Sequence, residues 1–334
     1  MSRRAGDSPC TADAGRLPSQ PGGKTGTLCP RVSCRRVPRW TTGGATNTQL
    51  AAHAESGGRT LGHRYRIDAR LGGGGSGEVF RALDLRIGRP VALKVFTLED
   101  ASPQDVRQYA AEARVLAGLS HPGLVALFDV GADVDPVLGP VAFLAMELVE
   151  GVTLRETIAD GPLPAAVTAQ IGLQLAVALE HAHAAGVVHR DIKPSNVLVA
   201  HTEGAPVVMN QPVLTVVLAD FGIASRGARS GRGASSTSGT ASYQSPEQAL
   251  GMEVGPPSDV YSLGLVLLEC RTGARTYPGE PLASSLARLL GPVPVPTDLG
   301  PDWCALLTQM TAAEPGDRPS SAAVALTLQN LAQP

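Results

Sequence analysis

The chain has 334 residues and a formal net charge of -2, and its 43% hydrophobic content is enough to form a packed core in one large domain or two modest ones. The near-neutral charge argues against nucleic-acid binding as the main task, and no apolar run approaches the roughly 18 residues of a membrane-spanning helix. The five cysteines include no Cys-x-x-Cys pair, and no apolar run follows the N-terminal arginines. We therefore expect no secretory signal and a reduced, cytoplasmic setting without disulfides or a zinc site.

The first 60 residues differ in composition from the rest of the chain. They carry nine Lys or Arg against three Asp or Glu, whereas the remainder carries 19 against 27. They are also rich in Gly, Pro, Ser and Thr and show no sustained helical or strand period. We expect a disordered basic N-terminal segment over residues 1–60, either a solvated leader or a segment that touches acidic surfaces. One folded domain should follow over residues 61–334.

The first part of this domain has the pattern of a sheet with one helix. Short segments rich in Val, Ile, Leu and Phe are separated by turn signals. One stretch instead places apolar residues at helical spacing, behind Ser102 as a candidate N-cap and Pro103 in the first turn. We predict a five-stranded antiparallel sheet and one helix: three strands between Tyr65 and Val95, two at Leu124–Val130 and Val141–Glu147, and the helix at Gln104–Leu119.

The second part of the domain is predicted to be mostly helical. Four segments have apolar residues at helical spacing, namely Pro164–Ala185, Ser258–Arg271, Pro301–Thr311 and Ser320–Leu331. Two apolar strands, Val197–Ala200 and Val213–Leu218, are separated by His201–Pro212. That separation exceeds the roughly two to five residues of an ordinary hairpin loop, so it predicts a surface insertion.

A glycine-rich stretch joins the first two predicted strands. Leu71–Val79 fits the pattern G-x-G-x-x-G-x-V at Gly72, Gly74, Gly77 and Val79. Glycines there allow the backbone to lie close over phosphate groups, and a position between two strands separates the stretch from a dinucleotide-binding turn. A flexible surface hairpin would explain the glycines equally well.

One lysine, Lys94, lies in an apolar strand with the sequence Val91-Ala92-Leu93-Lys94. A charge at such a position needs an anionic partner. Glu112, in the following amphipathic helix, can supply a carboxylate, and a bound phosphate can supply a second anion. The alternative reading of Glu112 is a solvated residue on an exposed helix face.

Two short segments carry the residue types of metal-assisted phosphoryl transfer. The octapeptide His189–Asn196 places Asp191, Lys193 and Asn196 just before one apolar strand, and Asp220-Phe221-Gly222 follows the next strand. Asp191 can accept or orient a hydroxyl proton, and Lys193 can neutralise charge on a transferring phosphoryl group. Asn196 and Asp220 offer the oxygen ligands that magnesium prefers.

Taken together and in this order, the motifs resemble the signature set of eukaryotic-type, or Hanks-type, serine/threonine protein kinases, especially those of bacteria. The resemblance covers residues 63 to about 332 and lacks no catalytic element. It implies an α+β, two-lobed protein kinase fold. The N-lobe, about residues 63–148, would hold the five-stranded antiparallel sheet and one helix, and the C-lobe, about residues 149–332, would be mainly α-helical. ATP would bind between the lobes together with Mg²⁺.

The resemblance also assigns roles to individual residues. Met146 would be the gatekeeper, and the backbone of Glu147 to Val149 would read adenine. An internal stack is implied for Leu116, Leu127, His189 and Phe221. The catalytic residues would be Asp191, Lys193, Lys94 and Glu112, and the metal ligands Asn196 and Asp220. The nucleotide contacts would come from Leu71, Gly72, Gly73, Gly74, Gly75, Ser76, Gly77, Val79, Ala92, Lys94, Met146, Glu147, Val149 and Leu198.

Downstream motifs resemble the end of a kinase activation segment. They are Gly239-Thr240 and Ser245-Pro246-Glu247, with Ser245 where the family more often has alanine. In the family, the glutamate equivalent to Glu247 pairs with an arginine, here Arg318, and the aspartate equivalent to Asp259 holds the catalytic-loop backbone. Thr272–Pro278 lacks the family's common Pro-Phe, which predicts unusual substrate docking.

The complete motif set favours transfer of the γ-phosphate of ATP to serine or threonine hydroxyls of proteins. A small-molecule phosphotransferase of the same fold is one alternative, but it normally lacks the Gly-Thr and Ser-Pro-Glu elements that form a peptide-docking platform. A pseudokinase scaffold is another, but it typically loses Lys94, Asp191 or Asp220, and all three are retained. Tyrosine specificity is disfavoured because Asp191-x-Lys193 resembles the serine/threonine pattern.

The resemblance further implies regulation by autophosphorylation. In the family, the arginine equivalent to Arg190 pairs with a phosphate on the activation segment. Candidate acceptors are Ser235, Ser236, Thr237 and Ser238, of which we favour Thr237. Expected partners are ATP, protein substrates with Ser or Thr acceptors, and a second copy of the chain during autophosphorylation. No nucleic acid and no membrane span are expected.

Overall fold

The computed structural model describes residues 58–74, 77–98, 103–201, 207–208, 211–212, 214–221 and 241–333. All of them belong to one compact unit. Residues 1–57, Gly75, Ser76, Ser102 and residues 222–240, to which several predictions refer, lie outside the described ranges. No helix among the described residues combines the length and apolarity needed to cross a membrane.

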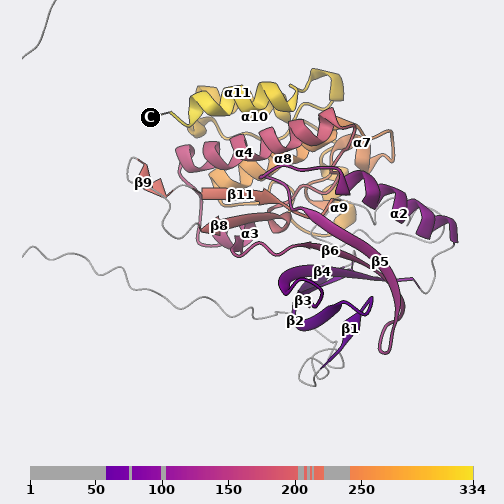
Figure 1. Cartoon of the computed structure of the whole chain (residues 1–334). Coiled ribbons are helices and arrows are strands. Elements are labelled where there is room, and N and C mark those ends of the chain that lie inside the picture. Colours follow the sequence, from indigo (N-terminus) through magenta and orange to yellow (C-terminus); the bar gives the residue numbers. More distant parts are fainter. Residues whose placement is uncertain are drawn as a thin grey trace, which may run out of the picture. The chain divides into compact units, whose positions relative to one another are not determined.

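The N-lobe is a six-stranded antiparallel sheet with the strand order β1-β2-β3-β4-β6-β5 (Figure 1). The five predicted strands are present, and a two-residue edge strand, β1, is added. The strands are β1 (Thr60–Leu61), β2 (Tyr65–Gly74), β3 (Gly77–Asp84), β4 (Arg89–Thr97), β5 (Leu127–Asp135) and β6 (Gly139–Glu147). The single N-lobe helix, α2 (Pro103–Ala117), packs against β5.

Strand β5 begins three residues later than predicted, at Leu127 instead of Leu124. Leu124 forms an isolated bridge with Leu218 and belongs to the hydrophobic core of the C-lobe. Its apolar character therefore reflects packing between the lobes and not a place in the N-lobe sheet. The strand also runs on to Asp135, beyond the predicted end at Val130.

The N-lobe sheet includes Thr60, the residue before the expected start of the folded domain at residue 61. Thr60 pairs with Arg66 in the β1–β2 ladder. Arg59 forms an ion pair with Asp135 at the end of β5, with 2.5 Å between Nε and Oδ2. Because β1 and β5 are the two edges of the sheet, this ion pair shows that the sheet curls until its edges approach each other.

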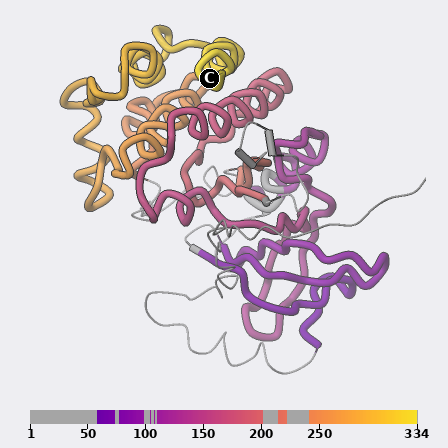
Figure 2. The backbone as a smooth tube through the Cα atoms, turned by 90° about the vertical axis from the view of Figure 1, so that its left-hand side faces the viewer, coloured from indigo at the N-terminus to yellow at the C-terminus, as the bar shows by residue number. Residues whose placement is uncertain are grey.

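The C-lobe is built mainly from helices, which Figure 2 shows in magenta, orange and yellow above the purple strands of the N-lobe. The four predicted helices are confirmed as α4 (Ala165–Ala184), α8 (Pro256–Thr272), α10 (Pro301–Met310) and α11 (Ser321–Leu331). Three shorter helices were not predicted, because helices of four to seven residues are too short to show a clear period. They are α3 (Leu154–Ile158), α7 (Pro246–Ala249) and α9 (Pro281–Ala287).

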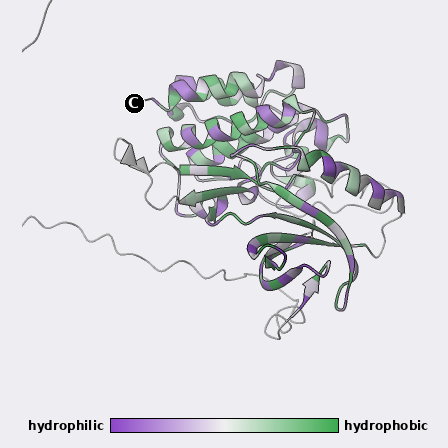
Figure 3. Ribbon diagram, viewed as in Figure 1, coloured by the Kyte–Doolittle hydropathy of each residue, from purple (hydrophilic) through white to green (hydrophobic). Residues whose placement is uncertain are grey.

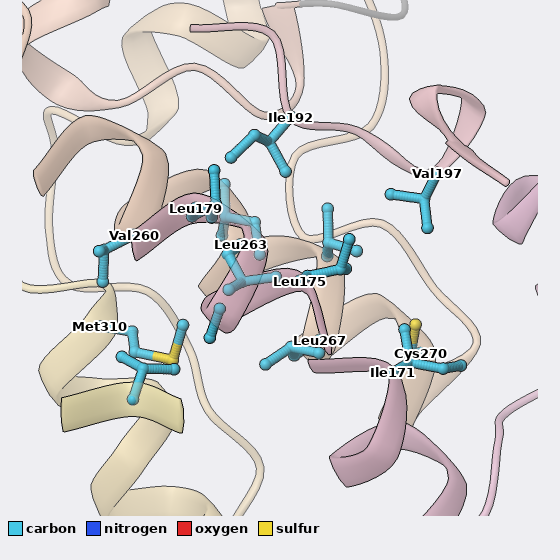
Figure 4. Packing of buried hydrophobic residues seen from close by; sticks show 14 of the residues in the cluster. Ile171, Leu175, Leu179, Ile192, Val197, Val260, Leu263, Leu267, Cys270 and Met310 are labelled. Atoms are coloured by element: carbon cyan, nitrogen blue, oxygen red, sulfur yellow. The ribbon is translucent and has the colours of Figure 1, made fainter. Parts of the chain in front are cut away.

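Helix α8 lies at the centre of the C-lobe, since its residues from Ser258 to Cys270 are all buried. It packs against α4 and α10, and α11 also packs against α4. Figure 4 shows Leu175 and Leu179 of α4 near Leu263 and Leu267 of α8 in this core. The α4–α8 contact needs a glycine, because a Cβ on Gly172 would come within 2.9 Å of side-chain atoms of Leu267 and Leu328. Helix α8 ends at Gly273, whose φ of 71° is the left-handed conformation common after helices.

A three-stranded sheet of order β11-β8-β7 lies where the two lobes meet. It consists of β7 (Val152–Thr153), β8 (Val197–His201) and β11 (Leu214–Leu218), and β11 is coloured mostly as hydrophobic in Figure 3. Within the predicted insertion, β9 (Val207–Val208) and β10 (Gln211–Pro212) pair with each other. The β11-β8-β7 sheet positions the site, because the segment that carries Asp191 and Asn196 precedes β8 and the segment that carries Asp220 follows β11.

Candidate active site

Lys94 and Asp220 form an ion pair across the boundary between the lobes, with 2.6 Å between Nζ and Oδ1. Lys94 lies in β4 between Val79 of β3 and Leu144 of β6, and its side chain is 6% exposed. The Asp220 side chain is 25% exposed, so the carboxylate remains reachable from solvent. The predicted need of Lys94 for an anionic partner is thus met by a residue 126 positions later in the chain.

Asp220 follows directly after the short connection from β11, in an unusual backbone conformation. Its φ is 64°, which lies in the left-handed region that aspartate and asparagine tolerate better than most residues. The next residue, Phe221, stacks on His189 with 4.6 Å between ring centroids. The turn is therefore held on one side by the Lys94 ion pair and on the other by an aromatic contact.

The loop before β8 brings the three predicted polar residues together. Lys193 Nζ lies 2.8 Å from Asp191 Oδ2, and Asn196 Nδ2 donates to the Asp191 carbonyl at 2.8 Å and to its carboxylate at 3.1 Å. The Asn196 side chain is buried and its backbone carbonyl accepts from Ala219 N, next to Asp220. The two predicted metal ligands thus lie on neighbouring segments joined by a backbone hydrogen bond.

His189 is fully buried, and burial lowers the pKa of its imidazole below the ordinary value. A neutral imidazole has one donor and one acceptor nitrogen. Nε2 lies 3.1 Å from the Ala219 carbonyl and can only donate there, while Nδ1 accepts from the backbone N–H of Asp191 at 3.3 Å. The ring therefore ties the loop that carries Asp191 to the segment that carries Asp220.

Asp259 binds the backbone of the catalytic loop that carries Asp191, as the resemblance implies. Its carboxylate accepts from the backbone N–H groups of His189 and Arg190, each at 2.8 Å. Its Oδ2 also lies 2.8 Å from His183 Nε2, and His183 Nδ1 lies 3.1 Å from Ser321 Oγ. Sequence reasoning missed His183 and Ser321, since an alanine-rich stretch of α4 and a serine at the start of α11 carry no distinctive pattern.

The glycine-rich stretch is a hairpin between β2 and β3, in which Gly72 pairs with Val79 and Gly74 with Gly77. Gly77 has a φ of 114°, and a Cβ there would lie 2.6 Å from the carbonyl oxygen of Val95. Only glycine fits this position. The predicted contacts Gly75 and Ser76 are outside the described residues.

The residues predicted to surround adenine come from neighbouring strands. Met146 in β6 pairs with Ala92 of β4 and with Leu127 of β5, and the N–H of Glu147 donates to the Ala126 carbonyl at 2.9 Å. The chain then passes through Val149 into β7, which pairs Thr153 with Leu198 of β8. The hinge expected at Glu147–Val149 thus lies at the crossing from one lobe to the other.

Behind the Lys94–Asp220 ion pair lies a small cavity of about 30 Å³. Among its lining residues are Leu116, Leu127 and Phe221 of the predicted internal stack and Met146, the predicted gatekeeper. With the contact between Phe221 and His189, the stack runs from helix α2 to the catalytic loop. Glu112 lies on the same helix and is partly buried.

The segment after the described gap is anchored by a buried ion pair. Arg318 donates to both carboxylate oxygens of Glu247, at 2.7 and 2.9 Å, and Ser258 Oγ also donates to Glu247. Burial alone raises the pKa of Glu247, but these bonds outweigh burial and hold the pKa below its usual value. Ser245 begins α7 as an N-cap paired with Gln248, so serine suits this position.

The residues present suit a divalent metal bound together with phosphate. Asn196 uses its Nδ2 toward Asp191, which leaves its amide oxygen as a ligand, and Asp220 presents a carboxylate beside it. Within the described part of the chain, no group of three or more His, Cys, Asp or Glu could hold a metal alone. A metal at Asn196 and Asp220 would therefore take its other ligands from phosphate oxygens and water.

Three features occur together between the lobes: the Lys94–Asp220 ion pair, the glycine-rich β2–β3 hairpin and the loop that carries Asp191 and Asn196. This combination defines a protein kinase domain. The sequence profile described as "Protein kinase domain" matches residues 65–329. The chain belongs to this family, whose members use ATP and a divalent metal.

Relatives of the chain include two mycobacterial enzymes. Serine/threonine-protein kinase PknB of Mycobacterium tuberculosis is 36% identical over 273 residues, covering 79% of this chain and 42% of PknB. Serine/threonine-protein kinase PknA of the same species is 39% identical over 250 residues, covering 73% of this chain and 56% of PknA. The chain thus spans about half the length of these relatives.

The fold also resembles a solved structure of the same class. The crystal structure of the Mycobacterium tuberculosis PknI kinase domain matches with a TM-score of 0.59 and 26% sequence identity. The match covers 80% of this chain and 96% of that chain. The two-lobed α+β kinase fold predicted from the motifs is thereby confirmed.

Proposed function

We propose that this chain is an active protein kinase that transfers the γ-phosphate of ATP, with Mg²⁺, to serine or threonine hydroxyls of proteins. The observation that carries the proposal is that the fold brings Lys94, Asp191, Asn196 and Asp220 together at one place between the lobes. These residues come from distant parts of the sequence. Packing alone gives no reason to bury a lysine at this position.

Each residue has a chemical task in this proposal. Lys94 would bind the α- and β-phosphates, with Glu112 as its candidate partner on α2. Asp191 would orient the acceptor hydroxyl and take its proton, while Lys193, 2.8 Å from that carboxylate, would offset charge on the transferred group. Asn196 and Asp220 would hold Mg²⁺, which supplies positive charge toward the phosphate oxygens when bound.

Protein substrates are favoured over small molecules by the anchored segment Ser245–Glu247. Gln248, which follows it, donates from Nε2 to the backbone carbonyl of Arg190 at 2.8 Å, next to Asp191. This contact fixes the position of the segment relative to the loop in which a hydroxyl would be activated. The retained Lys94, Asp191 and Asp220 disfavour a pseudokinase.

The experiment that tests the proposal uses the purified chain, γ-labelled ATP and myelin basic protein. We expect label in the protein when Mg²⁺ is present and none when the metal is chelated, with recovery when Mg²⁺ is added back. Release of label only as inorganic phosphate would contradict it. A cytoplasmic location, self-association during autophosphorylation and the site roles given above remain parts of the same proposal.

Autophosphorylation is the proposed route of activation. Arg190 precedes Asp191 with a φ of 71°, and its buried Nε has no hydrogen-bond partner within the described residues. A phosphate on Ser235, Ser236, Thr237 or Ser238 would give this cation a partner. Changing all four to alanine should slow phosphorylation of myelin basic protein about tenfold, which corresponds to the loss of one charge-assisted contact.

The matched control changes Ser225 and Ser230 to alanine. These two serines precede the 235–238 cluster in the sequence and are not among the candidate acceptors. We expect this control to keep the wild-type rate and the four-alanine variant to lose ATP-dependent mass gain in the cluster. Mass spectrometry before and after incubation with ATP measures the second point. Equal rates for the four-alanine variant and the wild type would show that the cluster is not a switch.

A further inference from the structure

Arg288, at the C-terminal end of α9, is a buried cation that neither the motifs nor the proposed chemistry uses. It is 3% exposed and takes part in no ion pair within the described residues. Its Nε and Nη2 donate to the Ser284 carbonyl at 3.1 and 2.9 Å, and Nη2 also donates to the Ala241 carbonyl. The guanidinium lies over the ring of Tyr277, 4.9 Å from its centroid.

A guanidinium in this environment is not explained by packing alone. Burying a charge without a carboxylate partner is costly, and burial lowers the pKa of Arg288 below its ordinary value. Arg288 Nη1 and Ser242 Oγ are both buried without a hydrogen-bond partner among the described residues. An apolar residue would fill the same space without these penalties, so the contact with Ala241 needs a functional explanation.

Ala241 belongs to a buried stretch that leads to the active site. The Tyr243 carbonyl accepts from Ser262 Oγ at 2.7 Å, and the Tyr243 hydroxyl donates to Glu269. The stretch continues to Glu247, which Arg318 anchors, and to Gln248, which reaches the catalytic loop. Helix α8 and the Arg318 ion pair therefore hold the stretch at Tyr243 and Glu247, while Arg288 holds it at Ala241.

We propose that Arg288 is a positioning residue for protein substrates: by binding the Ala241 carbonyl it holds the buried stretch 241–248 in the position that binding of a substrate chain beside Asp191 requires. This inference rests on the proposed function. It predicts that replacing Arg288 weakens binding of the protein substrate and leaves the Lys94–Asp220 ion pair unchanged, because the two sets of contacts share no residue.

A purely structural cation would behave differently from a positioning residue. Loss of a structural contact would lower the melting temperature and leave the Michaelis constants of the folded enzyme unchanged. Loss of a positioning contact raises KM for the protein substrate while KM for ATP and the slow hydrolysis of ATP by water stay the same. The split between the two Michaelis constants therefore separates the two roles.

The chain offers a matched control in Arg271. Its Nη1 donates to the Leu163 carbonyl at 2.8 Å and its guanidinium lies 5.5 Å from the Trp303 ring centroid. It is thus another C-lobe arginine that binds a backbone carbonyl and lies near an aromatic ring, but it belongs to a contact away from the 241–248 stretch. Arg271→Met and Arg288→Met remove the same chemical group.

The experiment measures steady-state phosphorylation of myelin basic protein by wild type, Arg288→Met, Arg288→Lys and Arg271→Met. We expect Arg288→Met to raise KM for myelin basic protein about tenfold, with KM for ATP unchanged, because one charge-assisted hydrogen bond is lost. Arg288→Lys retains a charged donor that can reach one carbonyl, so its KM should lie between those of wild type and Arg288→Met. Arg271→Met should keep the wild-type KM.

Each outcome decides the matter. A wild-type KM for the protein substrate in folded Arg288→Met, or an equal rise in Arg271→Met, overturns the inference. Should Arg288→Met fail to fold, Arg288→Lys carries the test, and a wild-type KM in that variant contradicts the positioning role. Absence of any transfer by the wild-type chain would instead overturn the proposed function, so the two failures remain distinguishable.

Discussion

Replacing Asp220 with asparagine is expected to reduce phosphate transfer at least about 1,000-fold, which corresponds to roughly 4 kcal/mol of lost transition-state stabilisation. The substitution removes the charge that the proposed Mg²⁺ site needs and that Lys94 Nζ contacts at 2.6 Å. The fold should survive, because asparagine tolerates the left-handed φ of 64° that this position requires.

A matched control for this prediction is Asp302→Asn, which makes the same chemical change on an exposed residue of α10. We expect this variant to phosphorylate myelin basic protein at the wild-type rate. Cooperative thermal unfolding of Asp220→Asn would show that lost activity is not lost structure. Transfer by Asp220→Asn within a few fold of the wild type would exclude Asp220 as the metal ligand.

Replacing Arg318 with methionine is expected to lower the free energy of unfolding by about 3–5 kcal/mol. The Arg318 side chain is fully buried and that of Glu247 is 5% exposed, so the substitution strands the carboxylate. It also removes donors to the carbonyls of Ala312 and Ala313 at 2.8 and 2.9 Å. The pKa of Glu247 should then rise, since burial is no longer outweighed by the guanidinium.

Urea unfolding followed by circular dichroism measures this loss. The matched control is Arg66→Met, which breaks an exposed ion pair with Asp68 whose side chains are 46% and 37% exposed. Such a pair should contribute less than about 1 kcal/mol. If Arg318→Met were no less stable than Arg66→Met, the buried ion pair would not be the anchor that the geometry indicates.

The sequence predicted those parts of the fold that repeat a local period over many residues. Helix α8 was expected at Ser258–Arg271 and lies at Pro256–Thr272, because two prolines begin it and Gly273 ends it. Strand β1 and helix α9 were not predicted, because two or seven residues show no usable period. The edge strand is held by contacts with distant residues, such as Arg59 with Asp135, which a local pattern cannot indicate.

The motifs predicted some contacts of the candidate site, such as Glu247 with Arg318 and Asp259 with the catalytic-loop backbone, but not others. Lys94 required an anion, and the structure supplies Asp220, whereas the expected roles of Glu112 and a bound phosphate stay predictions. The role of His183 beside Asp259 and that of Arg288 beside Ala241 depend on which residues the fold brings close. No helix was predicted around Arg288, so no pattern in the sequence indicated that its guanidinium would be buried.

Identification of the phosphorylated residue tests the central claim most directly. Myelin basic protein is labelled from γ-labelled ATP by the wild-type chain and by Asp191→Asn, and acid hydrolysis then separates the phosphoamino acids. The account predicts label in phosphoserine and phosphothreonine with the wild type and none with Asp191→Asn, whose amide cannot take the hydroxyl proton. Label in phosphotyrosine, or equal label with both proteins, would contradict it.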